Sequence, residues 1–118
     1  MLRTSRKHLL LAGNDIQLLH TQVLLFQLAG FEVVVVFTPA DARLALTDFQ
    51  VQGVVLGRSL SFEDRAQIAF DASAIRPGVA ILELATAHYG PEHLVTWARS
   101  IGWAGADQAG SSRYGPTA

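Results

Sequence analysis

Four short apolar runs divide the chain at regular intervals. They span residues 9–12, 32–37, 54–57 and 79–84, and the second contains four consecutive valines. A short continuous apolar run, rich in β-branched residues and bounded by turn-forming residues, is typical of a strand that is buried on both faces. The pattern therefore predicts four strands in the interior of a layered domain.

The segments that follow these runs carry apolar residues every three or four positions, which is the spacing of one helical face. They predict helices over residues 16–29, 39–49, 61–75 and 91–101. The positions expected to face the core are Ile16, Leu19, Val23 and Phe26, then Ala42, Ala45, Leu46 and Phe49, then Phe62, Ala66, Ala69 and Ala72, and finally Leu94, Val95, Ala98 and Ile101.

Residues with known capping preferences precede these helices. Asn14 or Asp15 can accept a hydrogen bond from the backbone at the start of the first helix. Thr38 can cap the second helix, with Pro39 at its first position. Ser61, followed three residues later by an aspartate, resembles a capping box. These signals support the helix starts that the apolar spacing predicts.

The alternation of strands and helices predicts an α/β fold with three layers, in which helices cover both faces of a parallel sheet through right-handed crossovers. We expect a single domain over residues 1–101. Residues 102–118 are dominated by Gly, Ser, Ala and Pro, and we expect them to form a flexible C-terminal tail.

Composition narrows the range of functions. Half of the 118 residues are hydrophobic and 16% are charged, which favours an ordered globule. The formal net charge of −1, with no basic cluster, argues against nucleic acid and against an anionic membrane surface as partners. The apolar stretch near the N-terminus is too short for a signal peptide, and no run approaches the roughly 20 residues of a membrane span. With no cysteine, and with histidines that lack metal-ligand spacing, we expect a cytoplasmic protein without a metal site.

Five segments follow one another in a distinctive order and spacing: HLLLAGNDIQLL, LLFQLAGFEVVVV, TPADARLAL, VQGVVLGRSL and IRPGVAILELATA. They are spread over roughly residues 8–87, and PEHLVTWARSI follows as a last helix. In pattern and spacing these segments resemble the receiver domain of response regulators, a flavodoxin-like fold of the chemotaxis type. The resemblance implies a place in two-component (phosphorelay) signalling of the bacterial type.

Receiver domains act through an aspartate at the end of the third strand, which accepts a phosphoryl group. Two acids after the first strand hold Mg²⁺ beside it, and the metal neutralises the phosphoryl oxygens. A Thr or Ser after the fourth strand and a Lys after the fifth strand then sense the phosphoryl group. Each of these positions can be sought in the present chain.

The phosphoacceptor position falls on Gly57, which has no side chain to phosphorylate. The acid pair falls on Gly13 and Asn14, so that only Asp15 remains of the acidic cluster. One carboxylate is a poor Mg²⁺ site, because hard cations need several oxygen ligands. The resemblance therefore supports the fold and argues against the reaction, which makes the chain a degenerate receiver, or pseudo-receiver.

The second half of the pattern is also incomplete. The sensing hydroxyl falls on Ala85, or on Thr86 if the register slips by one residue. The fifth strand and its lysine are missing, because the loop leads almost directly into the last helix. We therefore expect a sheet truncated to four parallel strands in the order 2-1-3-4, with the first and last helices on the same face.

Three functions fit these observations to different degrees. We favour a receiver-like signalling module that is not phosphorylated and acts through contact with a protein partner; homodimerisation stays open. The alternative is a small-molecule-binding domain of flavodoxin-like type that uses the crevice at the carboxyl ends of the strands. An enzyme is the least favoured, because the sequence offers no catalytic residues and no cofactor motif.

Several residues have two interpretations. Asp15 could be a remaining cation ligand, but a carboxylate at a helix N-terminus is the more common role. Arg58 could attract an anion, although such a residue is more often a solvated loop side chain. Glu83 could protect an edge strand against pairing or simply lie at the wet end of the sheet. Trp97 and Trp103 could anchor a partner or pack on the core.

Overall fold

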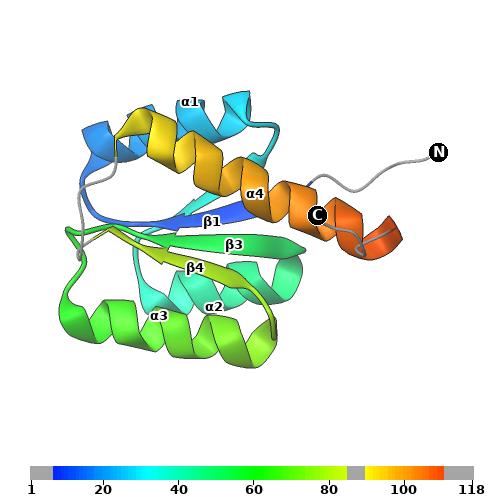
Figure 1. Ribbon diagram of the computed structural model, residues 1–118. Coiled ribbons are helices and arrows are strands. Elements are labelled where there is room, and N and C mark those ends of the chain that lie inside the picture. The colour runs from blue at the N-terminus through cyan, green and yellow to red at the C-terminus, as the bar shows by residue number, and fades with distance from the viewer. Residues whose placement is uncertain (1–6, 85–89, 111–118) are drawn as a thin grey trace.

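The structure, a computed structural model, describes residues 7–84 and 90–110. Strands and helices alternate along the chain as the apolar pattern predicted (Figure 1). The elements are β1 (His8–Ala12), α1 (Ile16–Leu28), β2 (Glu32–Val36), α2 (Pro39–Asp48), β3 (Val51–Leu56), α3 (Phe62–Ile75), β4 (Ala80–Glu83) and α4 (Pro91–Gly110).

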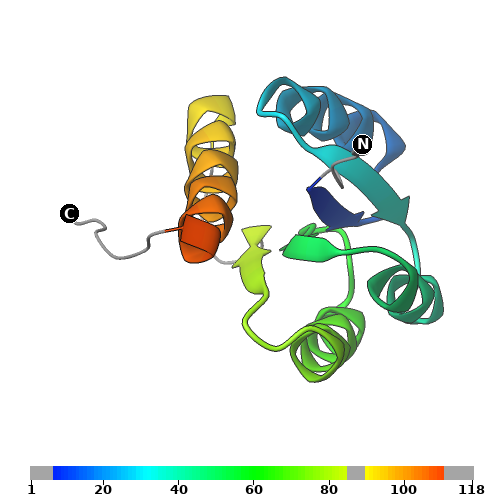
Figure 2. The ribbon, with the colours of Figure 1, turned by 90° about the vertical axis from the view of Figure 1, so that its right-hand side faces the viewer.

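The sheet has four strands in the order β2-β1-β3-β4, and every neighbouring pair is parallel. Helices α1 and α4 cover one face of the sheet, and α2 and α3 cover the other (Figures 1 and 2). The predicted strand number, strand order and helix placement are therefore confirmed for the described residues. β1 and β3 lie in the middle of the sheet, and β2 and β4 form its edges.

Each face of the sheet contributes to its own hydrophobic layer. Leu9 and Leu11 of β1 pack with α1 and α4, whereas Leu10 of the same strand packs with α2 and α3. All three side chains are completely buried. A central parallel strand is covered on both sides, which explains why its sequence is continuously apolar rather than alternating.

The helix starts follow the predicted capping residues. Asp15, and not Asn14, caps α1, because its Oδ1 accepts from the N–H of Leu18 at 3.2 Å. The hydroxyls of Thr38 and Ser61 accept in the same way from the third residue of α2 and α3. Each cap satisfies a backbone N–H that has no partner within its own helix.

The predicted buried faces of three helices need correction. Ile16 is 66% exposed, Phe62 is 75% exposed and Phe49 is 39% exposed, and Ala66 is exposed as well. In α3 the predicted Ala72 is buried and Ala69 packs against the core in part, and the prediction missed two further buried positions, Ile68 and Asp71. The other core positions predicted for α1 and α2, and Leu94 and Ala98 of α4, are at least partly buried.

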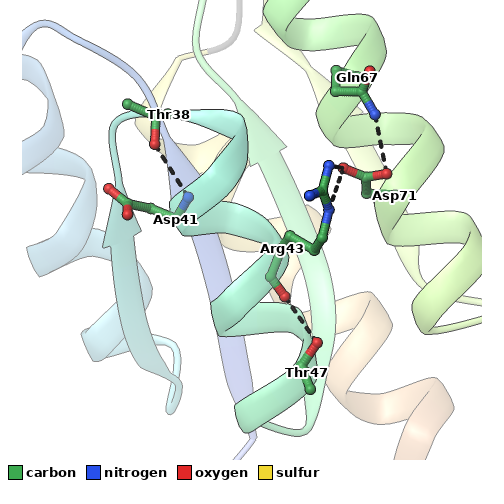
Figure 3. A network of polar contacts seen from close by, with 6 residues as sticks. All are labelled: Thr38, Asp41, Arg43, Thr47, Gln67 and Asp71. Carbon is green, nitrogen blue, oxygen red and sulfur yellow. Dashed lines mark hydrogen bonds and ion pairs between the residues drawn. The ribbon is translucent and has the colours of Figure 1, made fainter.

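A charged contact joins α2 and α3 and shows which side of α3 faces α2. Nε and Nη2 of Arg43 donate to Oδ2 of Asp71 at 3.3 and 3.2 Å, and Nε2 of Gln67 donates to Oδ1 at 3.1 Å (Figure 3). Asp71 therefore faces α2. Phe62 lies nine residues earlier on the helix, and at about 100° per residue this places it on the opposite side.

The last helix is longer than predicted and packs directly on β3. It continues to Gly110 instead of ending near Ile101, so that part of the predicted tail is helical; residues 111–118 lie outside the described residues. A Cβ on Gly53 would lie 2.5 Å from Ile101 and 3.0 Å from Trp97. The missing side chain of Gly53 is therefore what lets α4 approach the sheet so closely.

Trp97 is part of the core on the α1 side. Its ring meets Phe26 of α1 edge-on, with ring centroids 6.4 Å apart. This geometry is favourable for an aromatic pair. The interpretation of Trp97 as a core residue is therefore confirmed, and the side chain of Trp103 lies outside the described part.

Candidate functional site at the carboxyl ends of the strands

The loops after β1 and β3 meet at one end of the sheet (Figure 1). Ala12 and Leu56, the last residues of the two strands, are partners in the parallel ladder. The Gly13–Asp15 loop and the turn that begins at Gly57 therefore lie side by side. This is the place where an open α/β sheet normally holds its ligand or its reactive groups.

The backbone of β1 occupies the space in which a side chain at position 57 would begin. The N–H of Gly57 donates to the carbonyl oxygen of Ala12 at 2.8 Å. A Cβ on Gly57 would lie 2.9 Å from the same oxygen and 3.4 Å from the Cα of Gly13. The φ of Gly57 is outside the left-handed region, so the backbone conformation itself is open to other residues. Contact with β1, rather than conformation, requires glycine here.

A second set of hydrogen bonds joins the two loops. The N–H of Asn14 donates to Oγ of Ser59 at 2.8 Å, and Nδ2 of Asn14 reaches the carbonyl oxygen of Ser59 at 3.5 Å. The N–H of Gly13 donates to the carbonyl oxygen of Val36 at 3.2 Å. The backbone donors at positions 13, 14 and 57 are thus all paired with protein acceptors.

The structure places Asp15 in the predicted capping role and Arg58 in an exposed turn. The Asp15 carboxylate caps α1 and is exposed, so its position is explained by the helix terminus. Arg58 is an exposed residue of the turn after β3.

Three further residues that the sequence analysis singled out, Ala85, Thr86 and Glu83, lie at or beyond the end of β4. Ala85 and Thr86, the alternatives for the sensing hydroxyl, lie outside the described residues. Glu83 is half-buried at the end of β4, which is both an edge strand and the carboxyl end of the sheet. Both interpretations of Glu83 therefore stay open at this point.

Sequence reasoning missed two polar contacts. The sequence marks Ser59 only by its place two residues beyond the predicted end of the third strand. Its hydrogen-bond partner, Asn14, lies 45 positions away in the chain. Asp71 is only 8% exposed, and an acid on the buried side of an amphipathic helix could have indicated a partner. That partner, Arg43, comes from α2.

Searches for metal sites and membrane spans found none in the part of the chain that the structure describes. No group of three or more His, Cys, Asp or Glu side chains is arranged to hold a metal ion there. No helix among the described residues has the length and apolar character needed to cross a membrane. The observed polar contacts at the carboxyl ends are hydrogen bonds within the protein.

Comparison with known proteins places this geometry in context. No protein-family model and no curated protein matches the sequence. Among solved structures, the chain is similar to the crystal structure of a response regulator receiver domain protein (CheY-like) from Methanospirillum hungatei JF-1, with a TM-score of 0.69. The match covers 87% of this chain and 99% of that chain at 13% identity.

The chain has the receiver fold. With an identity of 13%, the match establishes this flavodoxin-like architecture and leaves the activity open. Within the receiver fold, the end of β3 is the position from which the phosphoacceptor would extend. At the end of β3 in this chain, the Gly57 N–H donates to the carbonyl oxygen of Ala12, and the N–H of Asn14 donates to Oγ of Ser59.

Proposed function

We propose that the protein is a receiver-like signalling module of the two-component type that acts through protein–protein contact without being phosphorylated. The observation that carries this proposal is the 2.9 Å approach of the Ala12 carbonyl to the site of a Cβ on Gly57. Gly57 offers no carboxylate, and a side chain at this position would require the ends of β1 and β3 to shift. The receiver fold supports the signalling context by analogy.

The surrounding groups support a role without phosphoryl transfer. Phosphoryl transfer depends on positioned charges that stabilise the transferred group. Here the only carboxylate in the described loops after β1 and β3 is Asp15, and it caps a helix. In this proposal no step requires a metal ion or a cofactor.

The alternative, a small-molecule-binding domain of flavodoxin-like type, finds less support. Such a domain would use free backbone donors at the carboxyl ends of the strands to hold an anionic ligand. The donors of Gly13, Asn14 and Gly57 are already paired within the protein. No observation on the described residues favours this function over the first.

Incubation of the protein with acetyl phosphate and Mg²⁺, followed by intact-mass measurement, tests the proposal. The expected result is an unchanged mass and unchanged amide chemical shifts. A receiver domain with an intact acceptor aspartate, treated in parallel, controls for the activity of the phosphodonor. A stable gain of one phosphoryl group that maps to Ser59 or to any other residue near Gly57 would contradict the proposal.

A further inference from the structure

The helices on the two faces of the sheet are held in different ways. α2 and α3 are joined to each other by polar side chains. Arg43 of α2 donates to the carboxylate of Asp71 at 3.2 Å. Arg76, at the end of α3, donates from Nε and Nη2 to the carbonyl oxygens of Leu46 and Phe49, at 3.0 and 2.7 Å. These directional bonds fasten α3 to α2 at two places.

The contact of α4 with α1 and the sheet is apolar. Leu94 of α4 is buried in the same hydrophobic layer as Phe26 of α1, and the ring of Trp97 packs against Phe26. The side-chain hydrogen bond in residues 90–101 is internal to the helix, from Oγ of Ser100 to the carbonyl oxygen of Trp97. No hydrogen bond or ion pair joins a side chain of these residues to another described element. This part of α4 is therefore held by the burial of apolar surface.

The order of the elements also sets α4 apart from the other helices. α1, α2 and α3 each connect two strands of the sheet, so that strands fix both of their ends. α4 follows β4, and no described strand follows α4. Separation of α4 from the sheet therefore breaks none of the hydrogen bonds between the described strands. The free energy of a local opening is set by the contacts that the opening breaks, and for α4 these are apolar side-chain contacts.

These contacts lie along one side of α4. Leu94, Trp97, Ala98 and Ile101 follow helical spacing, and all of them belong to or pack against the layer that α4 shares with α1. Ile101 and Trp97 occupy the space beside Gly53, at 2.5 and 3.0 Å from the place of a Cβ on that residue. Because one row of a single helix makes all of these contacts, they are expected to break together rather than one after another.

We propose that α4 separates from the sheet as one cooperative unit, while the sheet and the α2–α3 layer stay folded. The open form uncovers an apolar surface made of Leu9, Gly53 and Phe26, on which α4 otherwise rests. α4 thereby acts as a reversible cover over one face of the sheet. The inference does not depend on the proposed signalling function, because it rests only on how the helix is held.

Native-state hydrogen exchange of the full-length chain, followed by NMR over a series of low urea concentrations, tests the proposal. When closing is faster than chemical exchange, each amide reports the free energy of the opening that exposes it. The amides of residues 95–101 should share one opening free energy and one urea dependence. They should be at least about ten-fold less protected than the most protected amides of β1 and β3. Equal protection of α4, β1 and β3, or protection that falls steadily along α4 without a common opening, would overturn the proposal.

Ile101→Ala tests the contacts that hold α4 in place. The shortened side chain loses its contact beside Gly53 in the docked form and has no such contact to lose in the open form. Exchange of the α4 amides should therefore become at least about ten-fold faster. Thr96→Ala, at an exposed position of the same helix, is the matched control and should change these rates by no more than about two- to three-fold. Unchanged α4 exchange in Ile101→Ala would contradict the proposal.

Arg76→Ala distinguishes the opening of α4 from unfolding of the whole protein. It removes the bonds to Leu46 and Phe49, which are present in both the docked and the open form. The amides of β1 and β3 should exchange several-fold faster, whereas those of α4 should keep the rates of the parent chain. Arg43→Ala, which removes the contact with Asp71, should give the same pattern, and circular dichroism verifies that the variants fold. If the amides of α4, β1 and β3 all speed up by the same factor, α4 opens only with the whole protein and the proposal is wrong.

Discussion

Replacing Gly57 by alanine should destabilise the protein by about 2–4 kcal/mol. The new methyl carbon would lie 2.9 Å from the Ala12 carbonyl oxygen, a backbone atom that cannot rotate away. Relief requires the ends of β1 and β3 to separate, which lengthens the 2.8 Å hydrogen bond between the Gly57 N–H and this oxygen. Overpacking of this kind costs about 1–3 kcal/mol, and a weakened hydrogen bond adds about 0.5–1.5 kcal/mol.

Urea unfolding measures this loss directly, with tryptophan fluorescence as the signal because Trp97 packs on Phe26 in the core. Gly13→Ala is the matched control. A Cβ at position 13 would meet Cδ2 of Leu19 at 3.1 Å, which is the end of a flexible side chain. Its expected cost is about 1 kcal/mol or less. If Gly57→Ala is as stable as the parent chain, the β1 backbone yields easily and the argument that the site has no room for a carboxylate is wrong.

Four further outcomes are expected. Gly57→Asp, treated with acetyl phosphate and Mg²⁺, should not be labelled efficiently, as judged by intact mass, and its amide chemical shifts should not change in β4 and α4. Efficient labelling, or shift changes that spread to these elements, would mean that the site is nearly intact. Gly53→Ala should cost about 2–4 kcal/mol in urea unfolding, because its methyl overlaps side chains of α4 and β1; a neutral effect would contradict the close packing of α4. Arg43→Ala should cost about 1 kcal/mol in the same assay, since Asp71 keeps Gln67 but loses its cation; no loss would mean that the ion pair is incidental. Calorimetric titration should find negligible Mg²⁺ affinity, and sub-millimolar binding that disappears in Asp15→Ala would contradict this.

The architecture could be predicted because the local signals agree with one another. The apolar residues of β1 and the valines of β2 indicate buried strands, and Asp15, Thr38 and Ser61 begin the helices that follow. The orientation of α3 could not be predicted in the same way. Its apolar residues are spread around the helix; Ile68 and Ala72 are the ones in the core, and on this buried side Asp71 pairs with Arg43 of α2.

For the candidate site, the sequence could predict only which side-chain groups are absent, and not how the residues that are present pack. Gly57 shows by its identity that no carboxylate is present. The Ala12 carbonyl lies where a side chain at position 57 would begin because β1 and β3 are neighbours in the sheet. The hydrogen bond between Asn14 and Ser59 joins residues 45 positions apart in the chain. Such contacts depend on how closely two strands and their loops approach one another. The spacing of apolar residues along the sequence carries no information on that distance.

Gly53 has a consequence for how the sheet can grow. Because Trp97 and Ile101 rest on Gly53 of β3, a central strand supports α4, and Leu82 of the edge strand adds to the same hydrophobic layer. A new strand can therefore join β4 without removing the support of the last helix. The fold is in this sense modular at one side: its width can change while the packing between α1, α4 and the central strands stays the same.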